Sequence, residues 1–447
     1  MTEPRVITAW LNYYNTPAFL DQTRQLAEVF MARHPEYRVE IVGHDWQELP
    51  GRVAEAARQG QAPTLAQFFY SATREALDLV DPAGRPLFRP VQRAVAGRRE
   101  ILGEPVVLDD LLPAVRDYYT VDGELTGMPT LASTAVFYVN TTLLEAAGVD
   151  TVPQTWQEVE TAAKALAAMP DGPEYPASWP NHGWIFQQSL AQQGGMLADR
   201  DNGRSGPAQR VDLCSPELMA YVRFWQQLHR SGGFLYTGDT DPSTCWGGTF
   251  EAFATQRVAM TISSSVAAPY MVETGRAAGF TVVAAPLPHN GDVPCAGTLI
   301  GGDSVWLRAG LDPAVEDGAL AFLQFLDNPR NAADRHKVSG YLPVTRPAAD
   351  LLTAEGWFAQ HPHLRVGLDQ LDASDRSAAV RGALIGDLTG IQAAAVAAMH
   401  DVLVDGVDPA ARFALASAQA QQLVDAYRTQ CHGTGAVRRS PDCVRVA

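Results

Sequence analysis

The start of the chain contains the pattern that most constrains the fold, which is a strand, a helix and a second strand in succession. Residues 6–11 have the apolar content of a strand, residues 17–33 have the periodicity of an amphipathic helix, and residues 37–42 form a second strand-like run. A helix that connects two strands allows them to pair in parallel. The sequence therefore predicts an α/β fold that begins with a parallel sheet.

Strand and helix signals continue to alternate along the chain. Thr155 is followed three residues later by a glutamate, which is the pattern of a capping box at a helix start. Other helices are expected to begin after Ser215 and after Asp312. The alanine-rich segment 391–427 is expected to form two helices that are separated at residues 405–409. This alternation extends the α/β prediction to the whole chain.

The segment 122–142 contains a tight polar turn, a stretch of small residues and a β-rich run at 135–139. Asn140 follows that run and can cap a helix. Ser133 and Thr134 precede it and present hydroxyl groups without bulk. One interpretation is an ordinary hairpin followed by a strand. The other is a chain that lines a cleft as it passes into a second lobe.

Length and charge limit the architecture and the partners. The chain has 447 residues, which exceeds one common core and suits two lobes of about 200 residues each. Charged residues make up 19% of the chain, and the net charge is −16. Basic residues form no cluster larger than short pairs such as 98–99 and 438–439. We therefore expect no nucleic-acid partner.

The N-terminus and the cysteines leave the compartment open. No apolar run reaches the roughly 20 residues that span a bilayer, and the first residues do not form a signal peptide. If Met1 is the native start, the chain is expected to be cytoplasmic. If the start is a processed or replaced terminus, we expect an extracytoplasmic protein, periplasmic or lipid-anchored. Cys431 and Cys443 can form a disulfide in an oxidising compartment.

Motifs for nucleophilic catalysis, phosphate cradling and zinc binding are absent from the sequence. The pair His361 and His363 is interpreted as part of a solvated loop, and the segment 199–203 lacks a ligand that a calcium loop needs. We therefore expect no metal and no cofactor.

Aromatic and small polar residues instead gather where strands and helices are expected to end. Trp179 and Trp184 are expected to flank one loop, residues 263–265 to end a strand, and residues 301–304 to precede another strand. Flat aromatic faces suit the C–H faces of a sugar or polyol, and hydroxyl and amide groups suit its oxygens. This pattern indicates a binding site for a small hydroxylated molecule.

Six segments, in this order, resemble the substrate-binding proteins of carbohydrate ABC importers, most closely the glycerol-3-phosphate-binding type. They are Gln61-Ala-Pro-Thr-Leu-Ala-Gln67, 125–140, 258–265, Leu299-Ile-Gly-Gly-Asp-Ser-Val-Trp306, Phe325-Leu-Asp-Asn-Pro329 and Ser339-Gly-Tyr-Leu-Pro-Val-Thr345. Together the six segments are specific for this family, although no single segment is.

The resemblance implies a two-lobed periplasmic-binding-protein-like fold of type II, similar to maltodextrin-binding protein, with discontinuous lobes joined by a hinge and a helical C-terminal part. The first lobe is expected to comprise residues 1–118 and 264–328, and the second lobe residues 119–263 and 329–430. The segment 122–142 then becomes the first crossing into the second lobe. Residues 431–447 are expected to form a poorly ordered tail.

Carried over by position, the resemblance implies a set of ligand-facing residues, namely Trp46, Tyr70, Ser133, Trp179, Trp184, Ser264, Ser265, Gly302 and Tyr341. Two positions depart from the glycerol-3-phosphate-binding type. Tyr70 stands where that type has a glutamate, and Leu384 stands where it has an arginine, with Arg381 nearby but out of register. Because an arginine can bind phosphate through two charge-assisted hydrogen bonds, these departures favour a different ligand.

The function that the resemblance implies is capture of a sugar, polyol or glycoside, with or without a phosphate, in an interlobe cleft. We expect a monomeric protein that closes on the ligand and delivers it to the membrane subunits of an ABC permease. The alternative is a cytoplasmic enzyme or ligand sensor on the same fold. As an enzyme it would use His182 with Asp45 or Asp303 for acid–base chemistry.

Overall fold

The computed structural model describes residues 3–13 and 17–432. Its internal contacts divide the chain into two compact units. Unit 1 comprises Met1–Ala132, Gly301–Trp357 and Asp425–Ala447, and unit 2 comprises Ser133–Ile300 and Phe358–Val424. Both units are discontinuous in sequence, and the first change of unit, between Ala132 and Ser133, falls within the segment 122–142.

The bounds of the units differ from those predicted for the lobes. Residues 264–300 lie in unit 2, because the strand β13 (Val282–Ala285) pairs with a strand of that unit. Residues 329–357 lie in unit 1, where the helix α14 (Pro329–Ser339) packs against another helix of the unit. Residues 119–132 also belong to unit 1. Of the predicted tail, residues 433–447 lie outside the described residues, as does the pairing of Cys431 with Cys443.

Unit 1 contains a six-stranded sheet with the order β2-β1-β3-β14-β4, in which β14 also pairs with β9. Its strands are β1 (Arg5–Tyr13), β2 (Tyr37–Asp45), β3 (Leu65–Phe69), β4 (Phe88–Arg89), β9 (Met128–Ser133) and β14 (Gly301–Arg308). The first strand is parallel to β2, with Arg5 opposite Tyr37, and it is also parallel to β3. This confirms the predicted parallel start, whereas β14 inserts antiparallel to β3 and β4.

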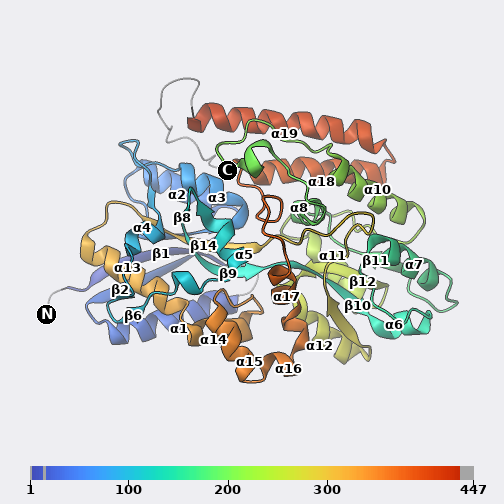
Figure 1. The fold of residues 1–447 in the computed structure, drawn as a ribbon, viewed down its shortest axis with the longest axis horizontal. Helices are drawn as coiled ribbons and strands as arrows, with labels where there is room; N and C mark the ends of the chain where they lie inside the picture. The colour runs from blue at the N-terminus through green and yellow to red at the C-terminus, as the bar shows by residue number, and fades with distance from the viewer. Residues whose placement is uncertain (1–2, 14–16, 433–447) are drawn as a thin grey trace. The chain divides into compact units, whose positions relative to one another are not determined.

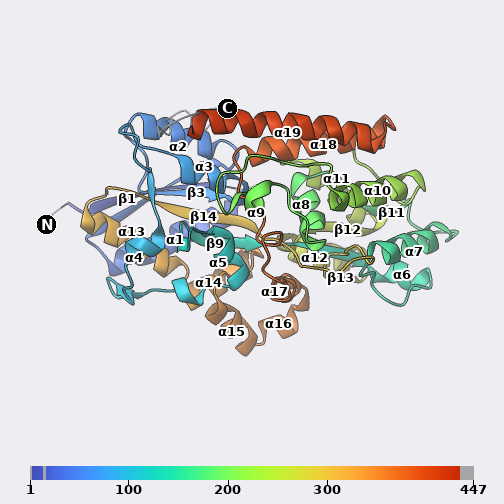
Figure 2. The ribbon, with the colours of Figure 1, turned by 45° about the horizontal axis from the view of Figure 1, so that its top comes forward.

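Helices cover both faces of this sheet. Figures 1 and 2 show α2 (Leu49–Arg58) and α3 (Thr73–Asp78) on one side, while α1 (Pro17–Arg33), α13 (Pro313–Leu326) and α14 pack together on the other. The smaller elements are α4 (Val91–Val95), β5 (Glu100–Ile101), β6 (Glu104–Pro105), α5 (Pro113–Tyr119), β7 (Thr120–Val121), β8 (Glu124–Leu125) and α15 (Arg346–Ala354). The predicted turn at Asp122 and Gly123 joins β7 to β8, and both residues have positive φ.

Unit 2 contains a four-stranded sheet with the order β11-β12-β10-β13. The strands β10 (Ala135–Asn140), β11 (Tyr175–Ser178) and β12 (Val258–Ser264) join β13 in it. The helices of the unit are α6 (Thr141–Ala146), α7 (Trp156–Ala167), α8 (Gly183–Gln192), α9 (Asp199–Gly203), α10 (Pro216–Arg230), α11 (Cys245–Ala254), α12 (Ala268–Ala278), α17 (Val366–Asp372) and α18 (Leu388–Val404). Of these, α8, α10 and α18 pack against one another. The helices α16 (Trp357–Gln360) and α19 (Pro409–His432) each have residues in both units.

The helix boundaries predicted from capping residues are confirmed. Thr155 and its N3 glutamate form a reciprocal capping box at the start of α7. The side chains of Asn140, Ser215 and Asp312 accept hydrogen bonds from backbone N–H groups in the first turns of α6, α10 and α13. The alanine-rich segment forms two helices. The first, α18, ends at its C-cap residue Asp405, and the second, α19, begins at Pro409.

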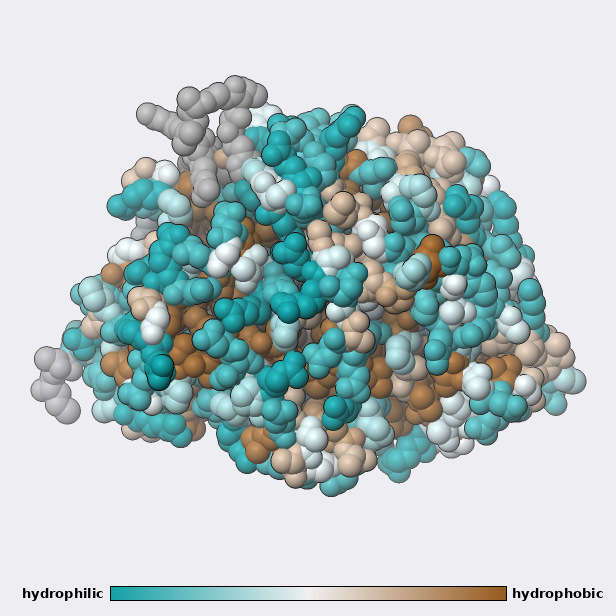
Figure 3. All heavy atoms as spheres, viewed as in Figure 1, coloured by the Kyte–Doolittle hydropathy of each residue, from teal (hydrophilic) through white to brown (hydrophobic). Residues whose placement is uncertain are grey.

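On the face drawn in Figure 3, hydrophilic residues predominate and apolar residues form smaller areas among them. None of the helices in the described part of the chain has both the length and the apolar content that a membrane span requires.

Candidate functional site

In unit 1, two of the predicted ligand residues lie directly after strands of the sheet. Trp46 comes directly after β2, and Tyr70 comes directly after β3. Both strands are parallel to β1, so these residues lie at the edge formed by the carboxyl ends of three parallel strands, where α/β proteins bind ligands. The ring of Phe69 lies 4.8 Å from that of Trp46 and 4.7 Å from that of Tyr70. The structure therefore brings the two predicted aromatic residues together around one phenylalanine.

Tyr341 is placed by the loop that follows α14. The imidazole Nδ1 of His336 lies 2.7 Å from the Tyr341 carbonyl oxygen and donates to it. The Tyr341 ring packs 6.2 Å from that of Phe19, and burial raises the pKa of its hydroxyl. The predicted tyrosine thus has a fixed backbone and a neutral hydroxyl group.

Gly302 occupies a position that a side chain cannot fill. Its φ is +112°, and a Cβ atom there would lie 2.2 Å from the carbonyl oxygen of Leu131 in β9. The prediction that residues 301–304 precede a strand is wrong, because β14 begins at Gly301 to form its pairing with β3 and β9. Gly302 therefore permits the close approach of two strand backbones.

A buried polar network lies beside this edge. The Gln67 amide donates from Nε2 to Asp303 Oδ2 at 2.7 Å, and its Oε1 accepts from the backbone N–H of Asn12 at 3.0 Å. The Asn12 side chain is fully buried near the end of β1, and neither atom of its amide has a hydrogen-bond partner in the described structure. A buried amide without partners is costly unless another molecule supplies them. The sequence analysis missed Asn12, although its place at the end of the first strand was a usable signal.

In unit 2, small hydroxyl residues meet where β10 and β12 pair. Ser264 lies opposite Ala135 and is the last residue of β12, within the segment 263–265 where the sequence predicted the end of a strand. Its hydroxyl accepts from the backbone N–H of Val266 at 3.3 Å, and the Ser265 N–H donates to the Thr134 carbonyl at 2.8 Å. The Ser265 hydroxyl in turn accepts from the Thr134 N–H at 3.3 Å, and the neighbouring Ser133 is buried.

Trp179 belongs to an aromatic cluster inside unit 2. Its ring lies 4.5 Å from Phe234, 5.8 Å from Trp225 and 6.1 Å from Phe224, with the last pair stacked. The indole is only 2% exposed. Trp179 therefore packs against side chains of its own unit, which is a core role that spacing in the sequence did not reveal.

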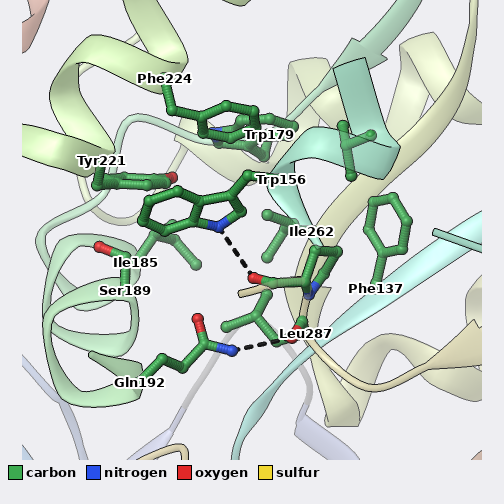
Figure 4. A pocket seen from close by; sticks show the side chains of 12 residues that line it. Phe137, Trp156, Trp179, Ile185, Ser189, Gln192, Tyr221, Phe224, Ile262 and Leu287 are labelled. Carbon is green, nitrogen blue, oxygen red and sulfur yellow. Dashed lines mark hydrogen bonds between the residues drawn. The ribbon is translucent and has the colours of Figure 1, made fainter. Parts of the chain in front are cut away.

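A small pocket lies against this cluster, as Figure 4 shows. Trp156 and Phe224 stack at 5.1 Å on one side, and Gln192 lies opposite, with its Nε2 donating to the Leu287 carbonyl. The Trp156 Nε1 donates to the carbonyl of Pro288. The pocket holds about 10 Å³, which is room for one water-sized molecule and far too little for a sugar.

Trp184 and His182 define the start of α8. The sequence predicted that Trp179 and Trp184 both flank a loop. This is wrong for Trp184, because His182 caps α8 and the helix already begins at Gly183. The His182 Nδ1 accepts a hydrogen bond from the Trp184 N–H at 3.1 Å, and burial lowers the pKa of the imidazole to about 4. The Trp184 Nε1 donates to the Ile300 carbonyl at 3.2 Å. At neutral pH, His182 is therefore an uncharged capping residue.

The acid–base set proposed for an enzyme is not assembled within either unit. His182 lies in unit 2, while Asp45 and Asp303 lie in unit 1. Asp45 accepts from the backbone N–H of Gln47 at 2.8 Å, which stabilises the turn after β2. The described residues also contain no group of three or more His, Cys, Asp or Glu side chains that could hold a metal ion.

The second departure from the resembled type, Leu384, lies in the apolar interior of unit 2. It is 1% exposed, and its N–H donates to the carbonyl of Asn202 at 2.8 Å. The guanidinium of Arg204 holds the same loop by donating to the carbonyls of Arg381 and Gly382. The loop is therefore fixed by backbone contacts, and its residue 384 provides no charge to a ligand.

Comparison with known proteins identifies the class of molecule. A family model described as bacterial extracellular solute-binding protein matches residues 25–366. The sn-glycerol-3-phosphate-binding periplasmic protein UgpB of Salmonella typhimurium is 30% identical over 357 residues, which is 77% of this chain and 76% of that protein.

Two solved structures share the fold. The sugar-binding protein MalE of Xanthomonas citri has a TM-score of 0.75 at 19% identity, covering 95% of this chain and 98% of its own. UgpB of Mycobacterium tuberculosis in complex with glycerophosphocholine has a TM-score of 0.70 at 22% identity, covering 95% and 99%. The predicted fold, similar to maltose-binding proteins, is thereby confirmed.

Proposed function

We propose, from the premise that this chain belongs to the family of bacterial extracellular solute-binding proteins, that it captures a small hydroxylated solute for an ABC permease. The solute classes are a sugar, a polyol or a glycoside, with or without a phosphate. The observation that supports this most is the family match over residues 25–366. The alternative of an enzyme or sensor has no support from the relatives.

Each unit contains residues that suit this chemistry. In unit 1, Trp46 supplies a partly exposed aromatic ring at the carboxyl edge of the parallel strands, the buried Tyr70 packs beside it through Phe69, and the buried amide of Asn12 has unused hydrogen-bonding capacity. In unit 2, Ser264 and Ser265 place small hydroxyl groups at the end of β12, where this strand pairs with β10. Aromatic faces with a few convergent polar groups are typical of sites for small polar molecules.

We further propose that the solute carries no phosphate monoester. The relative from Salmonella is named for sn-glycerol 3-phosphate, but this chain has an apolar Leu384 in the loop where the resembled type has an arginine. An arginine binds phosphate through two charge-assisted hydrogen bonds, each worth about 1.5–3 kcal/mol. Without that contact, binding of a phosphate monoester loses several factors of ten relative to a neutral polyol or sugar.

We further propose that the protein acts as a monomer outside the cytoplasm, and that the solute favours a closed form over an open one. To reverse a 99:1 population of open molecules, the solute must prefer the closed form by about 5.5 kcal/mol.

The proposal is tested by isothermal titration calorimetry of the full chain with maltose, ribitol, glycerophosphocholine and glycerol 3-phosphate. We expect saturable 1:1 binding of at least one of the first three, and weaker binding of glycerol 3-phosphate. Small-angle scattering should show a smaller radius of gyration with the bound compound. Tightest binding of glycerol 3-phosphate would contradict the exclusion of a phosphate monoester, and no binding of any compound would contradict the function.

A further inference from the structure

The N-terminal turns of two helices in unit 2 bring together three rings that are far apart in the sequence. His182 and Trp184 lie at the start of α8, and Trp246 lies in the first turn of α11. The Trp246 ring is 5.1 Å from the His182 ring and 6.5 Å from the Trp184 ring. Trp246 is only partly buried, whereas Trp179 lies in the aromatic core. The partly exposed indole of Trp246 thus packs against two rings that are nearly buried.

Trp246 is held in place by its own loop. Its Nε1 donates to the carbonyl of Pro242 at 3.2 Å. The preceding turn is fixed by Asp239, whose Oδ2 accepts from the Thr244 hydroxyl at 2.7 Å and whose Oδ1 accepts from the Asp241 N–H at 2.9 Å. Since its N–H is already engaged and its loop is ordered, the indole offers its flat face and loses little conformational freedom on contact.

His182 presents one hydrogen-bond donor with a defined position. Because its Nδ1 accepts from the Trp184 N–H, the proton of the neutral ring is on Nε2. No hydrogen bond to the described residues engages Nε2, and this atom is not among the fully enclosed polar atoms that lack a partner, although the side chain is only 8% exposed. The N–H group can therefore donate to water or to an oxygen of a bound solute. The partly exposed indole of Trp246 beside it makes a hydroxylated carbon skeleton the best match.

We propose that His182 and Trp246 are ligand-contact residues for this class of solute. The indole of Trp246 packs on the C–H face of a sugar or polyol, and the His182 Nε2–H donates to one of its oxygens. This inference rests on the proposed function and adds two residues to it, neither of which was among the predicted ligand residues.

Three variants and a control test the assignment. His182→Ser keeps a helix-capping hydroxyl but removes the Nε2 donor. Trp246→Ala removes the indole face, and Trp246→Phe retains an aromatic face. The control Tyr270→Ala removes an aromatic side chain that is 50% exposed on α12 of the same unit. Each protein is titrated calorimetrically with maltose, ribitol and glycerophosphocholine, and circular dichroism confirms that each variant is folded.

For the probe that wild type binds, we expect Kd to rise about tenfold in His182→Ser and about tenfold in Trp246→Ala. Trp246→Phe should remain within about threefold of wild type, and Tyr270→Ala should not differ from it. If wild type binds a probe and both folded variants, His182→Ser and Trp246→Ala, bind it equally well, this inference is overturned and the proposed function stands. If wild type binds none of the three probes, the proposed function fails and the inference fails with it. If Trp246→Ala does not fold, His182→Ser decides.

Discussion

Acidification should destabilise the protein through His182. In the folded chain, burial lowers the pKa of this imidazole from 6.5 to about 4. In the unfolded chain, the same side chain takes up a proton at its ordinary pKa of about 6.5. Between these two values the unfolded state binds more protons than the folded state. The stabilising contribution is therefore complete above pH 6.5 and is lost progressively as the pH falls toward 4.

The size of this effect follows from the pKa shift. Each pKa unit corresponds to about 1.4 kcal/mol, so a shift from 6.5 to about 4 amounts to about 3 kcal/mol of unfolding free energy at pH 4. The cause is desolvation alone, since no charged neighbour contributes to the shift. Removing the imidazole while keeping a capping group should therefore remove the contribution of His182 to the pH dependence and leave the helix cap.

Urea unfolding of wild type and His182→Ser, measured at several pH values from 7 to 4, tests this reasoning. The difference in unfolding free energy between the two proteins should change by about 3 kcal/mol in favour of the variant as the pH falls. Parallel profiles for wild type and His182→Ser would refute the buried neutral state of His182.

Three further substitutions have expected effects on stability that urea unfolding can measure. Gly302→Ala should cost about 2–4 kcal/mol, because the new Cβ meets the Leu131 carbonyl at a strained φ, and a cost under about 0.5 kcal/mol would show that β9 and β14 can separate freely. Thr155→Ala should cost about 1 kcal/mol through loss of the capping box, and an unchanged stability would contradict that cap. Arg335→Met should cost about 3–5 kcal/mol because it leaves the buried Asp327 carboxylate without its partner at 2.8 Å, and a stabilised variant would disprove that dependence.

Local structure was predictable because its causes are local. A capping side chain and the N–H group that it binds are close neighbours in the sequence, so Thr155 and Asn140 marked the starts of α7 and α6 in advance. The parallel pairing of β1 and β2 followed from the helix between them. In these cases, the sequence pattern contains both partners of the interaction.

Long-range pairing was less predictable. The strand β14 inserts between β3 and β4, which both lie in the first quarter of the chain, and nothing near Gly301 indicates those neighbours. For the same reason, the segments 264–300 and 329–357 were assigned to the wrong parts of the fold. Their place depends on which sheet or helix they pack against, which the local pattern does not contain.

The candidate site shows the same division. Trp46 and Tyr70 were recognisable because they directly follow strands. Spacing alone did not distinguish Trp179, which packs in the core, from Trp184, which begins a helix. Trp246 was missed because its partner rings lie at the start of a different helix, about 60 residues earlier in the chain.

The most direct test of the central claim is native mass spectrometry of the full chain purified without added solute, followed by identification of any molecule released on denaturation. We predict one bound molecule per chain, and that it is a sugar, polyol or glycoside. A bound peptide or metal ion in its place would contradict the account, as would a chain that carries no solute and acquires none from maltose, ribitol or glycerophosphocholine.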